Sequence, residues 1–365
     1  MKNQSTRSVG LDIGKDSISV CIITEKGEEK NYKVSNKDEN FTDLQKLLRK
    51  TDRVGMETGN LSFFISSLLQ EKVGCSTYVL NANMLWNIIR SKAKTDKHDA
   101  REIAEVIETV SEDRLPIVNI PDETQIQMRE VITEMSQLNK VRTQVINALH
   151  ALFIKSGICS LKRTDLSTKE KRKQSIKRLP AKRQVRAQRL NEQITIFESQ
   201  KAELLVEMED LGFSVKENCE ISMSMPGVAM QTAVAIHAFL GNFSNFSSRK
   251  QVASACGLAP KLHQSGKTTI RGSISKAGPR ILRQLLVMAA WSIIRSKDTT
   301  KYKTIFTKIK ASRGAKVAIV AVARHMIEDL YTMHKKKELF KFDKDDPQEK
   351  LSKKLASYKM KRWIE

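Results

Sequence analysis

The hydrophobic and polar positions in the first third of the chain alternate in the manner of short strands followed by helices. Three β-rich runs, "SVGLDIG", "SISVCIITEKG" and "EKNYKVS", come first, and the tight turn "GKD" joins the first two. Helical spacing in "NFTDLQKLLRK" and "LSFFISSLLQE" then alternates with the buried strands "DRVGMET" and "GCSTYVLN". A helix from Asp96 to Val110 follows. This β-β-β-α-β-α-β-α order predicts an α/β domain over residues 1–115, with a mixed sheet flanked by helices.

From Thr124 onward the pattern changes to long helices with two apolar stripes. Their members are Val131, Met135, Leu138, Val145, Leu149 and Leu152 in the first, and Leu190, Ile194, Phe197, Leu204, Met208 and Leu211 in the second. Arg142 interrupts the first stripe and Lys201 the second. Stripes of this length predict an antiparallel helical hairpin or a short coiled coil within residues 116–220, and such stripes are usually core or a dimer seam.

A third region begins near Ile221 and is also expected to be mainly helical. In "SMPGVAMQTAVAIHAFLG" a Pro-Gly turn precedes an apolar helix, which resembles a helix-hairpin-helix. The backbone N–H groups of such a turn can contact a phosphate. We expect this domain to span residues 221–340, and the Lys-rich tail, residues 341–365, shows little pattern.

The charge balance of the chain indicates a polyanionic partner. The chain has 64 Lys and Arg against 41 Asp and Glu, a net charge of +23. This excess favours nucleic acid over membrane, and an aromatic content of only 5% argues against base stacking as the main contact. Residues 155–189 hold thirteen Lys or Arg and two acids. This basic segment is either a solvated face or loop or a phosphate-contacting arm, with Lys171, Arg172 and Lys173 as candidates.

The five cysteines are scattered and form no C-x-x-C pair. This spacing argues against a zinc site and a disulfide framework. No apolar run has the length of a signal peptide or a membrane span, so the expected location is the cytoplasm.

Four acids are candidates for a metal site. Asp12 ends the strand "GLDIG" and Glu57 ends the strand "VGMET", while Asp96 and Asp99 stand three positions apart in "KTDKHDA". Four carboxylates at one sheet edge would repel one another, and a pair of Mg²⁺ ions would remove that repulsion. Two-metal sites suit in-line displacement at a phosphodiester.

Each acid also has an ordinary structural interpretation. Asp96 and Asp99 also fit a helix cap with its capping box. Asp12 also fits a simple strand end, and Glu57 also fits a surface acid. The joint pattern is far more specific than any one member. Nucleotide-binding alternatives fail, because neither "GLDIGK" nor "QSGKT" has P-loop spacing and an actin-like second Asp-Gly turn is absent.

Ser265 is a candidate nucleophile in the loop "HQSGKTT". A serine before glycine is ordinarily part of a turn, but this loop is dense in cations that favour a nearby phosphate. The candidate nucleic-acid contacts there are Lys261, Lys267, Arg271, Lys276, Arg280 and Arg283.

Nearly the whole chain resembles one family. The motifs "VGLDIGKDSISV", "METGN", "KTDKHDA", "MPGV", "ACGLAPKLHQSGK" and "SISKAGPRILRQLLVMAA" occur in the order found in the DEDD recombinases. These are the insertion-sequence transposases of the IS one-hundred-and-ten type, which are related to the Piv-like DNA invertases.

The resemblance implies an N-terminal RuvC-like (ribonuclease H-like) domain in which Asp12, Glu57, Asp96 and Asp99 bind Mg²⁺, with Mn²⁺ as a substitute. It also implies a coiled-coil spacer used in oligomerisation, as a dimer or tetramer, and a transposase domain with Ser265 as nucleophile. In this family the acids of one protomer are thought to work with the serine of another. The resemblance further implies a bridge RNA that pairs with donor and target DNA, a bacterial or archaeal host, and a location at the nucleoid.

The predicted function is therefore an RNA-guided, Mg²⁺-dependent transposase. Two alternatives remain open from the sequence. One is a Holliday-junction nuclease in which water attacks and Ser265 is structural. The other is a nucleic-acid-binding scaffold without catalysis, in which the acids only cap and solvate.

Overall fold

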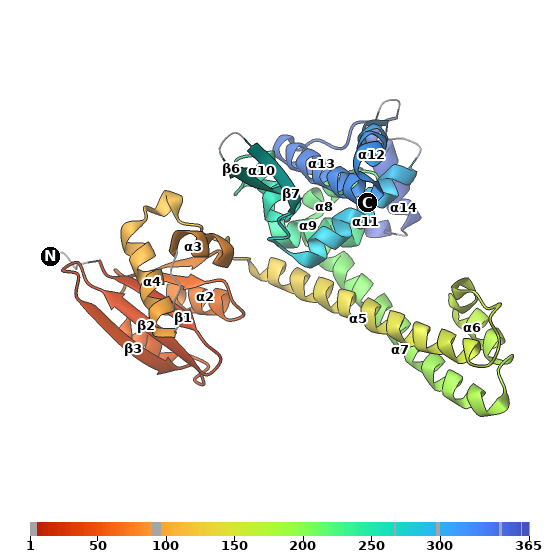
Figure 1. Ribbon diagram of the computed structural model, residues 1–365, viewed down its shortest axis with the longest axis horizontal. Coiled ribbons are helices and arrows are strands. Elements are labelled where there is room, and N and C mark those ends of the chain that lie inside the picture. The colour runs from red at the N-terminus through yellow and green to blue at the C-terminus, as the bar shows by residue number, and fades with distance from the viewer. Residues whose placement is uncertain are drawn as a thin grey trace. The chain divides into compact units, whose positions relative to one another are not determined.

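The chain forms two compact units, Met1–Pro121 and Asp122–Glu365 (Figure 1). The computed structural model describes residues 6–89, 96–265, 268–296, 300–342, 345–358 and 360–364. Among these residues, no helix combines the length and the apolar character that a membrane crossing requires.

The first unit is built on a five-stranded mixed sheet in the order β3-β2-β1-β4-β5. Its strands are β1 (Ser8–Ile13), β2 (Ser17–Ile23), β3 (Glu29–Ser35), β4 (Arg53–Glu57) and β5 (Ser76–Leu80). The first three strands pair antiparallel, whereas β4 and β5 run parallel to β1. The mixed sheet predicted from the sequence is thus confirmed.

Helices cover both faces of this sheet. Helices α1 (Thr42–Leu47) and α2 (Ser62–Lys72) bury Leu44 and Ile65 in one core with Val9 and Leu11 of β1. Helix α4 (Asp96–Thr109) lies on the opposite face, where its Ala100 and Ala104 pack with residues of β2. The predicted element order is confirmed, with α3 (Ala82–Ile89) and a short 3₁₀ turn, η1 (Glu112–Arg114), as additions that the sequence pattern did not indicate.

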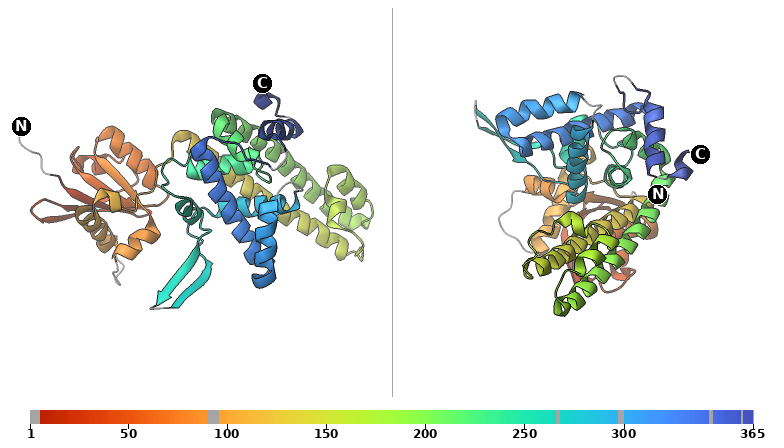
Figure 2. Two further views of the ribbon diagram at one scale, coloured as in Figure 1. Left: turned by 90° about the horizontal axis from the view of Figure 1, so that it is seen from above. Right: turned by 90° about the vertical axis from the view of Figure 1, so that its right-hand side faces the viewer.

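Two long helices begin the second unit and run antiparallel side by side, as both figures show (Figures 1 and 2). Helix α5 (Glu123–Ile154) starts at a capping box formed by Asp122 and Gln125, and α7 (Ala181–Ser214) returns along it. The predicted helical hairpin is therefore observed. The two polar residues that interrupt its stripes have partners across the hairpin, because Arg142 pairs with Glu198 and Lys201 with Asn139.

The basic segment between these helices is folded and not a loop. It contains a 3₁₀ turn, η2 (Arg163–Leu166), and helix α6 (Lys169–Ile176), which is capped by Thr168. Arg172 holds α6 against α7, since its Nη1 and Nη2 lie 3.0 and 2.7 Å from the carboxylate oxygens of Glu198 and its Nε lies 2.7 Å from Asn191 Oδ1. The side chain of Arg172 is fully buried, at 0% exposure.

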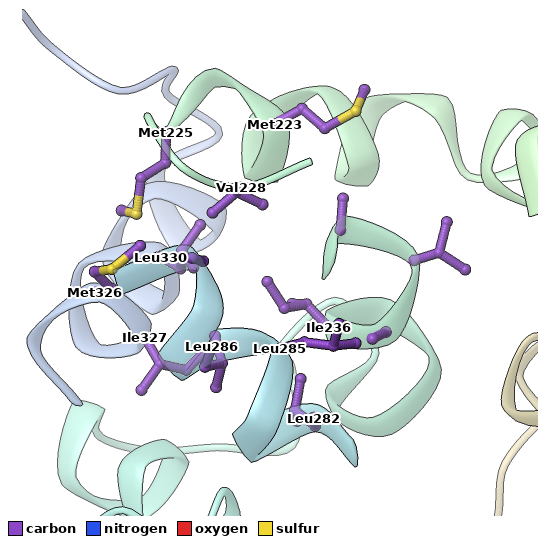
Figure 3. Close-up of a cluster of buried hydrophobic side chains, with 14 of the residues drawn as sticks. Met223, Met225, Val228, Ile236, Leu282, Leu285, Leu286, Met326, Ile327 and Leu330 are labelled. Atoms are coloured by element: carbon purple, nitrogen blue, oxygen red, sulfur yellow. The ribbon is translucent and has the colours of Figure 1, made fainter. Parts of the chain in front are cut away.

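The rest of the second unit is a helical assembly with one small sheet. Its elements are α8 (Lys216–Ser224), α9 (Met230–Leu240), α10 (Arg249–Ala255), β6 (Pro260–Ser265), β7 (Thr268–Ile274), α11 (Arg280–Arg295), α12 (Thr300–Arg313), α13 (Ala315–Lys336), α14 (Pro347–Ser357) and α15 (Lys361–Ile364). Buried side chains from α8, α9, α11 and α13 meet in a common core, in which Met223, Ile236, Leu286 and Met326 take part (Figure 3).

The tail, for which the sequence showed little pattern, contributes to this core. Leu351 and Leu355 of α14 and Trp363 of α15 are buried in it. These apolar residues are few and are separated by lysines, so they form no long periodic stripe in the sequence.

Candidate functional site

Asp12 and Glu57 are neighbours on two parallel strands of the first unit. The register pairs Gly10 of β1 with Gly55 of β4, and Leu11 with Met56, so the next residues on the two strands are Asp12 and Glu57. Paired residues of adjacent strands project from the same face of a sheet. The two carboxylates therefore leave one face together, at the carboxyl ends of their strands.

Helix α4 crosses this same face, and Gly10 determines how closely it approaches. A Cβ atom at residue 10 would lie only 2.0 Å from the carbonyl oxygen of Ala100 and 2.5 Å from the backbone nitrogen of Ala104. Because side chains alternate along a strand, Gly10 and Asp12 share the face that α4 covers. Asp99 is the residue before Ala100, so it belongs to the part of α4 that lies against β1 at Gly10, two residues from Asp12.

The carboxylates of Asp12, Glu57 and Asp99 are suitable ligands for a hard cation, but in the described residues they do not form a complete ligand set. Asp12 and Asp99 are half-buried and Glu57 is exposed. Asp96 is the first residue of α4, and its side chain lies outside the part that the structure describes. Within the described residues, no three His, Cys, Asp or Glu side chains are arranged as a metal site. Carboxylate oxygens are the ligands that Mg²⁺ prefers, so the donor type fits even though the ligand set is open.

Ser265 occupies the end of a β-hairpin in the second unit. It is the last residue of β6 and pairs with Thr268, the first residue of β7. The hairpin projects from the helices of this unit (Figure 2). The sequence indicated a Gly-rich loop here and missed the two strands. The side chain of Ser265 lies outside the described residues, as do Gly266 and Lys267 altogether.

The cations expected around Ser265 have different environments. Lys261, Lys276 and Arg280 are exposed. Arg283 is partly buried and donates hydrogen bonds to the carbonyl oxygens of Cys256 and Gly278, at 3.2 and 3.3 Å. Its guanidinium thus has a structural role in the turn before α11. The side chain of Arg271, on β7, lies outside the described part.

The candidate nucleic-acid contacts in the basic segment differ in their exposure to solvent. Lys171 and Lys173 are exposed on α6, where they can reach a phosphate. Arg172 is fully buried and bound to Glu198 and Asn191, so its position gives a phosphate no access to the guanidinium. The expectation that all three cations contact nucleic acid therefore does not fit Arg172, and the reason is tertiary packing.

The turn between α8 and α9 holds a lysine from the tail. Nζ of Lys354 donates to the carbonyl oxygens of Met223, Met225 and Val228, at 2.6, 3.1 and 2.7 Å. Burial lowers the pKa of Lys354 to about 8. The glycine of this turn, Gly227, has a φ of +85° and lies against α11, where a Cβ would come 2.4 Å from the Ala289 carbonyl oxygen.

A serine–histidine pair that the sequence did not reveal lies in the core. Ser222 Oγ is 2.8 Å from His334 Nε2, although 112 positions separate the two residues. Burial lowers the pKa of His334 to about 4, and the exposed fractions of Ser222 and His334 are 1% and 7%. No substrate reaches a pair at this depth, so we interpret it as a structural core contact. Within the described residues, Nδ1 of His334 has no hydrogen-bond partner.

Two family models match the chain. A transposase model of the DEDD type named for IS110 matches residues 9–155, and the transposase model of the IS116/IS110/IS902 family matches residues 219–304. The first range contains β1 to β5 and the four acids. The second range contains the α8–α9 turn and the hairpin with Ser265.

Curated relatives include transposases and a DNA-inverting protein. The chain is 25% identical over 346 residues to the transposase for insertion sequence element IS1111A of Coxiella burnetii, which covers 91% of each chain. It is 24% identical over 253 residues to a probable family 20 transposase of Pseudomonas aeruginosa, 67% of this chain and 74% of the relative. It is 29% identical over 111 residues to a pilin gene-inverting protein of Moraxella lacunata, 30% of this chain and 34% of the relative.

Replacing Gly10 by alanine should separate α4 from the sheet. Because the new methyl group would meet the helix backbone and not a flexible side chain, we expect a loss of about 1–3 kcal/mol or more in the free energy of unfolding. Gly59→Ala is the matched control, since a Cβ at residue 59 has no neighbour within 4 Å. Urea denaturation of both variants measures the difference. Equal stability of the two would contradict the close approach of α4 to β1.

Proposed function

Because this chain belongs to the IS110 family of DEDD transposases, we propose that it cuts and exchanges DNA strands as the transposase of an insertion sequence. The observation that supports catalysis most directly is the placement of Asp12 beside Glu57 on the face that α4 crosses with Asp99. Transposition of an element requires cleavage of phosphodiesters, and carboxylates on one sheet face suit that chemistry.

Residues 1–115 are proposed to be a ribonuclease H-like catalytic domain. Three antiparallel strands followed by two parallel ones, with α4 against the central strand, support this assignment. Asp12, Glu57, Asp99 and Asp96 would hold divalent metal, with Mg²⁺ as the expected ion. Bound Mg²⁺ would supply Lewis-acid activation of the scissile phosphate. The protein's own part is to place the carboxylates through the strand register and the α4 crossing.

Ser265 is proposed as the nucleophile, from a transposase domain at residues 221–340. Attack of its Oγ on phosphorus would form a phosphoserine ester, break the bond to one strand, and release that strand as a free hydroxyl that takes up the proton. Attack by another strand's hydroxyl on the ester would then rejoin DNA and restore the serine. Exposed Lys261, Lys276 and Arg280 near the hairpin would help to bind the phosphates.

The acids and Ser265 belong to different units of the chain, so a joint active site requires two units to come together. In the proposed enzyme they come from different protomers of an oligomer. The same separation favours one second candidate, a Holliday-junction nuclease that uses only the first unit and water. A covalent intermediate distinguishes these two.

The four acids should act as one catalytic set. We expect Asp12→Asn, Glu57→Gln, Asp96→Asn and Asp99→Asn each to abolish DNA strand cleavage, while DNA affinity stays close to that of the wild type. Affinity depends mainly on lysine and arginine contacts with phosphates, whereas the acids serve the metal-dependent step. Cleavage assays with Mg²⁺ and gel-shift titrations measure the two properties. Cleavage that persists after complete chelation of divalent metal would exclude the metal mechanism.

A covalent adduct should form at Ser265 when strand exchange stalls on a nicked substrate. Ser265→Ala should bind DNA but yield neither adduct nor recombinant, because the proposed nucleophile is its hydroxyl. Thr268 pairs with Ser265 at the end of the hairpin and also carries a hydroxyl, so an adduct at Thr268 would equally refute the assignment. Peptide mapping of the trapped complex by mass spectrometry identifies the site, with Ser273→Ala as the control variant. An adduct at Ser273 or a tyrosine would refute the assignment, and normal recombination by Ser265→Ala would favour attack by water.

A bridge RNA is proposed to choose the DNA partners, and the net charge of +23 supports the binding of such an RNA. Changing the pairing segment of the RNA encoded beside the gene should redirect insertion to the complementary target. Sequencing of the insertion junctions measures the change. An unchanged target would show that the protein alone selects DNA. Co-purification of RNA is no test, because a strongly cationic protein retains RNA non-specifically.

A further inference from the structure

A groove of about 720 Å³ lies between α6 and α7, and lysines form one of its walls. Lys169, Lys173 and Lys177 line it from α6 and the residue that follows α6, and all three are exposed. The opposite wall, on α7, carries Gln184 and Gln188. The groove therefore presents three cations to a ligand, opposite a wall that carries neutral amides and Glu192.

The three lysines stand in a row along one side of α6. They are four residues apart, so they recur on the same helix face at intervals of about 6 Å. This interval is comparable to the distance between consecutive phosphates along a nucleic-acid strand. Lys171, two positions from Lys169 and Lys173, does not line the groove. Only some of the cations in the basic segment therefore line the groove.

Buried polar contacts fix the two walls relative to each other. Arg172 lies on α6 between the lysines, and its guanidinium is bound to Glu198 and Asn191 of α7. At the end of the groove, Gln184 Nε2 donates to the carbonyl oxygen of Leu179 at 2.8 Å. A ligand therefore meets a preformed surface, which reduces the ordering that binding requires.

This geometry points to a binding groove for the sugar–phosphate backbone of one nucleic-acid strand. None of the described residues that line the groove is aromatic, so the contact is with the backbone and is independent of sequence. Glu192 on the α7 wall repels phosphates and so directs the strand towards the lysines. The inference rests on the proposed function only in so far as a recombinase must hold nucleic acid.

The test compares two variants that lose the same charge from the same segment. The groove variant is Lys169→Gln/Lys173→Gln/Lys177→Gln, and the control is Lys155→Gln/Lys182→Gln/Arg186→Gln, whose side chains are exposed but outside the groove. Full-length protein is titrated with labelled duplex DNA, single-stranded DNA and an RNA hairpin over a range of salt. The groove variant should lower the slope of log affinity against log salt by about two to three in at least one arm, and the control should not.

The arm that shows this loss identifies whether the strand is DNA or RNA. Glu192→Gln should act in the opposite sense and tighten binding in that same arm. Equal losses of affinity for the two triple variants would show that only the total charge of the segment matters, which contradicts a specific groove. Unchanged binding in every arm would also overturn the proposal. Strand cleavage by the wild type is measured on the same preparations. Cleavage without a groove-specific loss of binding would refute only the groove, and a groove-specific loss without cleavage would refute only the transposase activity.

Discussion

Helix α4 crosses β1 where the strand has no side chain, and the candidate site depends on this crossing. With a carbonyl oxygen 2.0 Å from where a Cβ of residue 10 would lie, only glycine permits the backbones to approach so closely. The contact anchors the middle of α4, so the first turns of the helix, with Asp99, are positioned relative to Asp12. A larger residue at position 10 would move a helix turn, and with it a carboxylate, by more than metal coordination tolerates.

A second constraint lies in the helical hairpin, where the core is interrupted by buried charge. Glu198 accepts from Arg142 and Arg172, and although burial raises its pKa, these hydrogen bonds and charges outweigh that effect and leave the pKa below its usual range. Removing Glu198, whose side chain is 31% exposed, would leave the fully buried guanidinium of Arg172 without a charged partner, which is destabilising. The same contact holds α6 against α7. Because α6 is fixed in this orientation, Lys169, Lys173 and Lys177 line one wall of the groove.

Much of the first unit could be predicted from the sequence, because its strands and helices differ in period and are separated by clear turn signals. The sequence also predicted that Asp12 and Glu57 lie at neighbouring strand ends, and the parallel register of β1 and β4 places them side by side. Short elements were missed where local pattern is weak: α3, α6, the hairpin of β6 and β7, and the tail helices. Lysines interrupt the pattern in α6 and α14, whereas α3 is a single short apolar run, and long-range contacts supply much of the stability of such elements.

The sequence by itself determined the mixed sheet, the helical hairpin, the excess of cations and the four acids that are candidates for a metal site. Tertiary structure alone decided which cations are available, because burial depends on contacts between residues distant in the chain. Arg172 and Lys173 are adjacent and chemically alike, yet one is enclosed by Glu198 and Asn191 and the other lines an open groove. The helical period turns neighbouring residues to different faces, and only packing shows which face meets another helix and which meets solvent.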